Sequence, residues 1–137
     1  MESNTVEVNI TDNSDEIMSR MDRAMEAALE KIGLVAEGYA KRLCPVDTGR
    51  LRNSITHATA SYPGIGTYQD KYGNVFDDAT VDGTPEKNAV YIGTNVEYAP
   101  YVELGTTRTK AQPYLKPAVV NHAAKYKKIF KDSMENA

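Results

Sequence analysis

A single long apolar stripe between residues 17 and 43 constrains the fold of this 137-residue chain more than any other feature. Its members recur at steps of three and four residues: Ile17, Met21, Ala24, Ala28, Ile32, Val35, Tyr39 and Leu43. This spacing follows the turn of an α-helix and predicts an amphipathic helix of about eight turns. Asn13 and Glu16 have the spacing of a capping box, so we expect the helix to begin there. Cys44-Pro45 should end it, because a residue before proline is displaced from helical backbone angles.

Two shorter segments flank this predicted helix. Residues 1–12 alternate valine and isoleucine with polar neighbours, which is strand periodicity and predicts an N-terminal arm or short strand. Residues 48–55 predict a short turn of helix that is capped by Asp47 or Thr48. This turn should lead into a strand that starts near Ile55.

The second half of the chain contains a turn-rich segment, a strand pattern and two helical patterns. Residues 61–88 are rich in Gly, Asp, Pro and Thr and predict a hairpin or a long loop insertion. Residues 89–94 are an apolar β-branched run, which is typical of a buried strand. Residues 98–105 predict a short helical turn, because proline lies near its start and glycine at its end. Residues 113–134 predict a second helix, and residues 132–137 are assigned to a C-terminal tail.

Together these elements predict an α+β domain with a long N-terminal helix, a small antiparallel sheet and a C-terminal helix. Residues 1–137 are treated as one domain, because a chain of this length can bury a core without covalent staples. No apolar run reaches the roughly 18 residues of a membrane span. The acidic, polar start is unlike a secretory signal. A single cysteine, Cys44, cannot form an internal disulfide and fits a reducing compartment.

Charge is distributed unevenly along the chain. Residues 1–40 carry a net charge of −6, and residues 108–137 carry +5. Opposite potentials steer and orient docking, so an acidic first helix and a basic last helix suit head-to-tail contact between copies. The alternative is that the two helices complement each other within one subunit.

Catalytic and metal-binding patterns are weak. Cys44 with His57 or His122 could act as nucleophile and base, but Cys44 lies at the end of an apolar stripe, where cysteine is usually a small core residue. The spacing of the cysteine and histidines matches no zinc site. The aspartates of residues 77–82 lack the calcium-loop pattern. We therefore predict no enzymatic activity, no metal and no cofactor; a hydrolase that uses Cys44 and His57 is a further hypothesis.

A nucleic-acid contact is the stronger alternative function. Four lysines of the last predicted helix lie beside Tyr126 and Phe130. They are Lys125, Lys127, Lys128 and Lys131. Such clustering is what phosphate contact requires, although a sequence pI of about 5.4 argues against a free DNA-binding protein. The alternative is that these lysines are solvated or pair with acidic neighbours, as in most lysine-rich terminal helices.

Four blocks of sequence, in order, resemble the bacteriophage gene-product-ten-like tail-component family, which includes neck and tail-completion proteins of long-tailed phages. The blocks are PVDTGRLRNSI at 45–55, YIGT at 91–94, YAPYVELGT at 98–106 and QPYLKPA at 112–118. Their order and rough spacing match across residues 14–131. The resemblance implies a non-catalytic virion protein that acts in several copies around the axis through which DNA leaves the capsid.

Within these blocks, five residues are candidates for a subunit interface. We expect Arg50 to pair with a carboxylate, and Glu103 is the predicted partner. Tyr98, Tyr101 and Tyr114 have an apolar body and a polar tip, which suits half-buried positions at a subunit boundary. The alternative is that all five are ordinary residues of the fold.

The sequence therefore predicts a ring at the phage head–tail junction, with six copies by analogy with tail symmetry. Neck, connector or tail proteins would be its partners, DNA would pass only as cargo of the channel, and no membrane would be involved. The chain would reside in the virion, after assembly in the host cytoplasm. A DNA-contacting module that uses the basic last helix is the alternative. The insertion at 61–88, as an exposed loop, is a candidate to line the channel or contact a neighbour.

Overall fold

The computed structural model describes residues 13–136, so the predicted arm at 1–12 lies outside the described residues. Five helices and four strands follow one another in this range. In chain order they are α1 (Ser14–Leu43), α2 (Arg50–Ser54), β1 (Thr56–Ala58), β2 (Gly66–Gln69), β3 (Val75–Ala79), β4 (Tyr91–Gly93), α3 (Ala99–Leu104), α4 (Leu115–Val120) and α5 (Ala123–Glu135). The α+β prediction, with a long first helix and a small antiparallel sheet, is confirmed.

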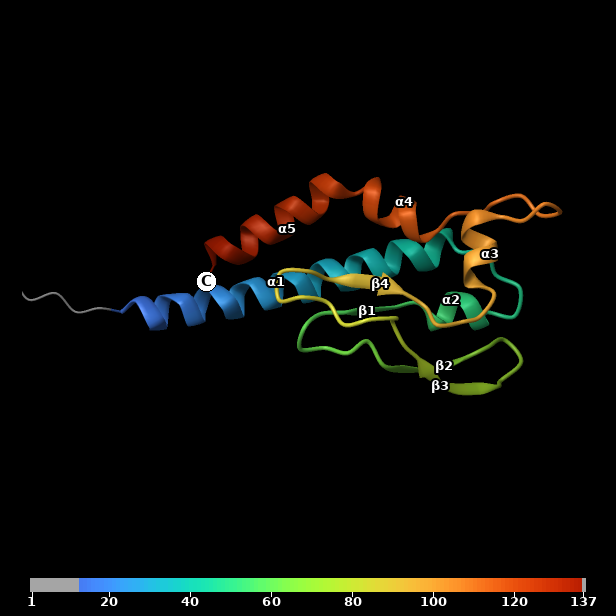
Figure 1. Ribbon diagram of the computed structural model, residues 1–137, viewed down its shortest axis with the longest axis horizontal. Helices are drawn as coiled ribbons and strands as arrows, with labels where there is room; N and C mark the ends of the chain where they lie inside the picture. Colours follow the sequence, from blue (N-terminus) through green and yellow to red (C-terminus); the bar gives the residue numbers. More distant parts are fainter. Residues whose placement is uncertain (1–12, 137) are drawn as a thin grey trace, which may run out of the picture.

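Helix α1 is the predicted long helix, and the other elements are arranged along it (Figure 1). It ends as expected before Pro45, where the Cys44 amide donates to the Ala40 carbonyl at 2.9 Å. The predicted capping box is wrong, because Asn13 makes no side-chain cap hydrogen bond. Glu16 instead pairs with Arg20 at 3.1 Å, one turn along the exposed helix surface.

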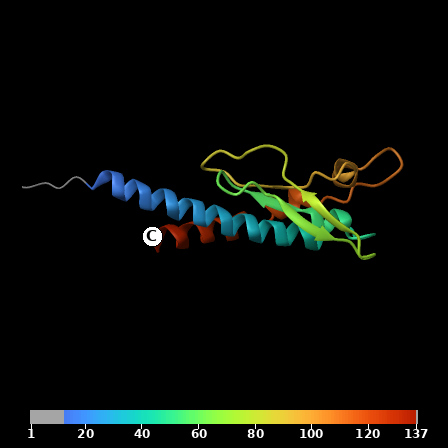
Figure 2. The same ribbon diagram turned by 90° about the horizontal axis from the view of Figure 1, so that it is seen from below.

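Two layers cover α1 on different sides. The strands lie on one side and α5 runs antiparallel to α1 on the other (Figures 1 and 2). Gly33 allows the close approach on the strand side. A Cβ atom there would lie 2.7 Å from Cδ2 of His57 and 2.8 Å from Cγ2 of Val90. These separations are shorter than van der Waals contact, so this glycine serves packing and not a bend.

The strands form two separate antiparallel pairs. β1 pairs with β4, with His57 opposite Ile92, and β2 pairs with β3, with Tyr68 opposite Phe76. The predicted hairpin in 61–88 is confirmed. It is not a free loop, however, because Tyr68 is buried and the hairpin packs against α2.

β4 is more exposed than predicted. In place of a buried run over 89–94 there is a three-residue strand, of which only Gly93 is fully buried. Among residues 13–136, β4 pairs with β1 alone, so it is an edge strand of a two-stranded sheet there.

The C-terminal region contains two helices where a single one was predicted. α4 ends at Val120, and α5 begins at Ala123. At the break, the His122 ring stacks on the Tyr39 ring of α1, with 3.5 Å between centroids and 2° between planes. α4 packs its buried Ala118 into the core, whereas α5 turns back along α1 and buries no side chain completely. The change of direction satisfies both contacts.

The main core lies where the C-terminal end of α1 meets α2, α3 and α4. Its buried members are Ala40, Cys44, Leu51, Ile55, Val96, Ala99, Tyr114 and Ala118. The blocks of sequence that resemble the phage family supply most of these residues. No helix within residues 13–136 is long and apolar enough to cross a membrane.

Candidate functional site

Arg50 holds α2, the hairpin and the loop before α3 together. Its guanidinium donates two hydrogen bonds to the Glu97 carboxylate, at 3.0 and 3.2 Å. It also lies over the rings of Phe76 and Tyr98, 5.2 and 5.9 Å from their centroids. The predicted pairing of Arg50 with Glu103 is therefore wrong. Glu97 is the partner because it lies in the loop that the guanidinium reaches, and the planar fork suits a two-oxygen acceptor.

Glu103 caps a neighbouring helix. From α3, its carboxylate accepts hydrogen bonds from the backbone amides of Tyr114, Leu115 and Lys116, at 2.7, 3.0 and 2.9 Å. These amides belong to the start of α4, whose N-cap residue Tyr114 provides no side-chain cap. A carboxylate satisfies the unpaired amides of a helix start and matches its partial positive charge. Glu103 thus joins α3 to α4 inside one subunit.

The three tyrosines differ in exposure. Tyr114 is fully buried, and its hydroxyl donates to the Ala99 carbonyl at 3.4 Å. Burial raises its pKa well above the ordinary range. The expectation of a half-buried Tyr114 at a subunit boundary is wrong, because its ring fills the core. Tyr98 is half-buried beside Arg50, and Tyr101 has 62% of its surface exposed on α3.

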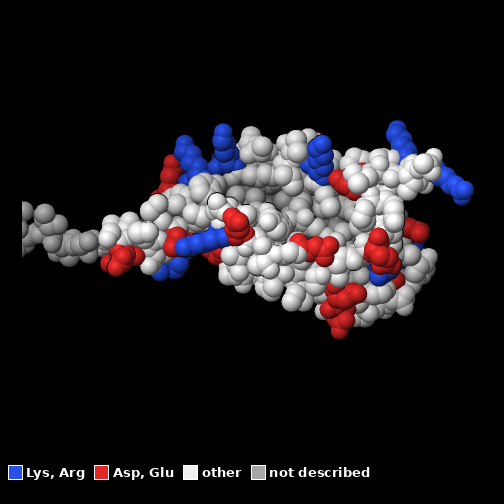
Figure 3. Space-filling model, in the orientation of Figure 1, with Lys and Arg blue, Asp and Glu red and all other residues white. Residues whose placement is uncertain are grey.

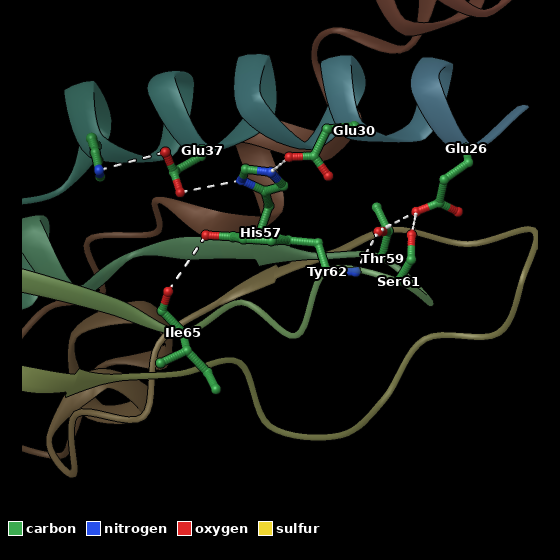
Figure 4. A network of polar contacts seen from close by, with 9 residues as sticks. Glu26, Glu30, Glu37, His57, Thr59, Ser61, Tyr62 and Ile65 are labelled. Carbon is green, nitrogen blue, oxygen red and sulfur yellow. Dashed lines mark hydrogen bonds and ion pairs between the residues drawn. The ribbon is translucent and has the colours of Figure 1, made fainter. Parts of the chain in front are cut away.

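His57 is held between two carboxylates of α1 (Figure 4). Its Nε2 lies 2.6 Å from Oε1 of Glu30, and its Nδ1 lies 3.3 Å from Oε1 of Glu37. Hydrogen bonding to Glu37, followed by that to Glu30, raises the pKa of His57 although burial opposes this. Burial would raise the pKa of Glu37, but hydrogen bonding from His57 and the charge of Lys41 lower it overall. This cluster fixes β1 to α1.

Two further acids of α1, Glu26 and Asp22, also contact groups of their own subunit. Glu26 accepts hydrogen bonds from Thr59 and Ser61, which follow β1 (Figure 4). Asp22 pairs with Lys87 at 2.7 Å. Much of the negative charge of α1 is therefore already satisfied within the subunit and is not free to attract a basic helix of another copy.

Basic residues of α1 border the groove that separates it from α5. Arg20, Arg23 and Lys31 line this groove of about 530 Å³, together with Ile129 and Asp132 of α5. None of the ion pairs within residues 13–136 joins α1 to α5. Direct ion pairs therefore do not hold the two helices together, whereas the stacking of the His122 ring on Tyr39 contributes to their packing.

The hypothetical pair of Cys44 with His57 or His122 does not have the properties of a nucleophile and its base. Cys44 is buried in the core, and burial raises its pKa to about 11, so the thiol stays protonated at neutral pH. A reactive cysteine needs the opposite shift. Both ring nitrogens of His57 contact glutamates, and the ring of His122 stacks on Tyr39. Within residues 13–136, no group of three or more His, Cys, Asp or Glu side chains could hold a metal ion.

The basic residues of α5 are exposed. They are Lys125, Lys127, Lys128 and Lys131. Figure 3 shows positive side chains along the edge of the molecule that α5 forms. Lys125 lies 5.5 Å from the centroid of the Tyr39 ring, and Lys131 lies 3.9 Å from Glu135. Lys127 and Lys128 make no ion pair in the part of the chain that the structure describes, so they are the ones available to a polyanion.

A comparison with models of known protein families identifies a family for this chain. The family model described as "Bacteriophage HK97-gp10, putative tail-component" matches residues 9–105. This range contains the first two blocks and almost all of the third, whereas the block at 112–118 lies beyond it. Neither the curated proteins nor the solved structures gave a match.

Proposed function

Because the chain belongs to the bacteriophage HK97-gp10-like tail-component family, we propose that it is a structural virion protein that forms a ring where head and tail join. Its partners would be further copies of itself and other neck, connector or tail proteins. The proposed ring has six copies, by analogy with the symmetry of phage tails. DNA would pass through it as cargo.

The observation that carries this proposal, besides the family, is the uncovered apolar surface at both ends of the molecule. Large apolar side chains are exposed at the start of α1 and again on α3. Large exposed apolar patches are rare on monomeric proteins, and where they occur they mark contact sites. A protein with contact sites at two places can form a chain of copies, and the chain closes into a ring when the rotation per copy divides the circle.

The chemistry described above suits a structural role. The polar groups of the family blocks are used in fixing the fold: Arg50 binds Glu97, and Glu103 caps α4. The thiol of Cys44 is held in its unreactive form. A non-enzymatic function is therefore part of the proposal.

Genetic removal of the protein from its phage tests this function. We expect filled heads and finished tails to accumulate separately when the chain is absent, because the joining ring is missing. Negative-stain electron microscopy would show the two classes of particle. Infectious virions of normal appearance would refute the proposal.

A DNA-contacting role is the alternative that a specific observation favours. Lys127 and Lys128 are exposed and without an ion pair among the described residues. If α5 contacts DNA, the double variant Lys127→Gln/Lys128→Gln should bind duplex more weakly, and the salt dependence should be shallower by about two phosphate contacts. Unchanged binding and salt slope would exclude this role for α5.

A further inference from the structure

The start of α1 carries apolar side chains that are not covered by any other part of residues 13–136. Ile17, Met18 and Met21 are each half exposed or more. Ile17 and Met21 belong to the stripe that continues to Ala28, which is buried. Figures 1 and 2 show the reason: α1 extends past the end of α5, and the strands lie nearer to its other end.

A second apolar surface lies at the opposite end of the molecule, on α3 and the loop that follows it (Figure 1). Tyr101 and Leu104, one helical turn apart, have 62% and 77% of their surfaces exposed. Beside Tyr101 is a pocket of about 270 Å³, which Thr106 and Lys110 of the loop also line. A flexible, unbranched side chain such as methionine fills irregular pockets of this kind well.

The charges at the two ends are opposite. Asp15 and Glu16 lie in the first turn of α1, whereas Arg108 and Lys110 are exposed in the loop 105–112. Figure 3 shows negative side chains at the start of α1 and positive ones projecting at the far end of the molecule. Like ends would repel, and unlike ends attract, so the charges favour one relative orientation.

We infer that copies of this chain join head to tail, with the start of α1 in one copy docked on α3 and the loop 105–112 of the next. Three features carry the inference: two uncovered apolar surfaces, a pocket on one of them, and opposite charge at each. The occupant is a second copy because the two surfaces are complementary. The start of α1 has apolar side chains and acidic residues, whereas α3 and the loop 105–112 have a pocket and basic residues. The inference deepens the proposed function, since it names the contact from which the ring is built.

This contact replaces the predicted contact of the acidic first helix with the basic last helix of a neighbour. α5 packs on α1 of its own subunit, and three acids of α1 are engaged by β1 and the loop after it. The first turn of α1 lies outside these contacts, and its Glu16 pairs with Arg20 on the exposed surface of the same helix. The acidic partner in the interface is therefore the tip of α1, and the basic partner is the loop 105–112.

Cysteine cross-linking tests the contact directly. A chain with Met18→Cys would be mixed with a chain that carries Leu104→Cys and then oxidised gently; Cys44 is buried and serves as an internal background. The matched control partner carries Val75→Cys, which replaces an apolar residue of similar exposure on the hairpin. At micromolar protein, the docked pair should oxidise on the order of a hundredfold faster than the control pair. Equal rates for the two pairs would overturn the inference.

Charge reversal gives an independent readout that a folding defect cannot imitate. Asp15→Lys/Glu16→Lys and Arg108→Glu/Lys110→Glu should each weaken association of identical copies by about tenfold or more, and a mixture of the two should associate again. Lys127→Glu/Lys128→Glu is the control and should associate like the unmodified chain. Failure of the mixed variants to associate, while each is folded by circular dichroism, would contradict the inference.

Electron microscopy of the oxidised mixture separates this inference from the proposed function. If the mixture forms closed rings but residues 18 and 104 are not cross-linked, the inference is overturned and the ring proposal is intact. Open filaments with the cross-link would support the inference and contradict the ring. Monomers that give only background cross-linking would overturn the head-to-tail contact.

Discussion

Replacing His57 with glutamine should make the protein less stable and remove most of its pH dependence above neutrality. His57 has only 6% of its side chain exposed and contacts Glu30 and Glu37 through its two ring nitrogens. Glutamine keeps a polar group at this position but cannot carry the positive charge. The variant therefore leaves two carboxylates facing an uncharged neighbour.

The cost follows from how exposed the two acids are. Breaking a fully buried ion pair typically costs about 3–5 kcal/mol. Glu37 is 15% exposed and retains Lys41 at 3.6 Å, and Glu30 is 44% exposed and can turn toward water. Both facts reduce the penalty, so we expect His57→Gln to lower the free energy of unfolding by about 2 kcal/mol at pH 6.

The pH dependence has a definite sign. The pKa of His57 in the folded protein lies above its ordinary value of 6.5, so the protonated ring stabilises the folded state. This contribution is complete below pH 6.5 and is lost as pH rises through the raised pKa, with a slope of at most about 1.4 kcal/mol per pH unit. The lowered pKa of Glu37 acts in the opposite direction and only in acid, where its contribution is lost as pH falls through the lowered value.

Urea unfolding followed by circular dichroism, at one protein concentration and at several values from pH 6 to 9, measures both effects. The unmodified protein should lose stability as pH rises over this range, and His57→Gln should show a nearly flat profile. Parallel profiles for the two proteins would refute this prediction, because they would show that the contacts with α1 do not raise the pKa of His57.

Four further substitutions test the packing of the fold. Gly33→Ala should destabilise the protein by about 1–3 kcal/mol, because its Cβ would clash with His57. Gly38→Ala, whose Cβ would meet nothing within 4 Å, should stabilise the protein by up to about 1 kcal/mol. Thermal unfolding compares the two variants, and equal effects would contradict the close approach at residue 33. Glu103→Ala removes three acceptor contacts at the start of α4 and should cost about 2 kcal/mol in urea unfolding, with a neutral effect counting against the cap. Arg50→Lys loses the two-oxygen pairing with Glu97. It should destabilise the protein less than Glu103→Ala does, because the Glu97 carboxylate is exposed. A larger loss of stability for Arg50→Lys than for Glu103→Ala would contradict this expectation.

The long first helix could be predicted because one periodic signal runs through it. Its apolar residues recur at helical spacing over the whole of α1, and a proline marks its end. The hairpin in 61–88 and the helical turn at 98–105 were also predictable, since turn residues and proline act locally. The break between α4 and α5 was not, because it depends on the stacking of His122 on Tyr39, which are 83 positions apart in the chain.

Partners of charged side chains were the least predictable part of the site. Glu97 and Glu103 lie close together in the sequence, and the residues around them do not indicate which of the two Arg50 contacts. Two signals were nonetheless present in the sequence. Glu26, Glu30 and Glu37 follow helical spacing and so share a side of α1, and Tyr114 at the start of a helix offers no cap of its own. Both indicate that a partner from elsewhere in the chain is required.

Ring assembly as proposed depends on copies that meet through the start of α1 and the loop 105–112. Cryo-electron microscopy of the purified protein, or of the neck region of virions, measures this directly. We predict a closed ring with Ile17, Met18 and Met21 of each copy within contact distance of Tyr101 and Leu104 of the next. A ring in which these side chains face solvent, or subunits that meet through other surfaces, would contradict it.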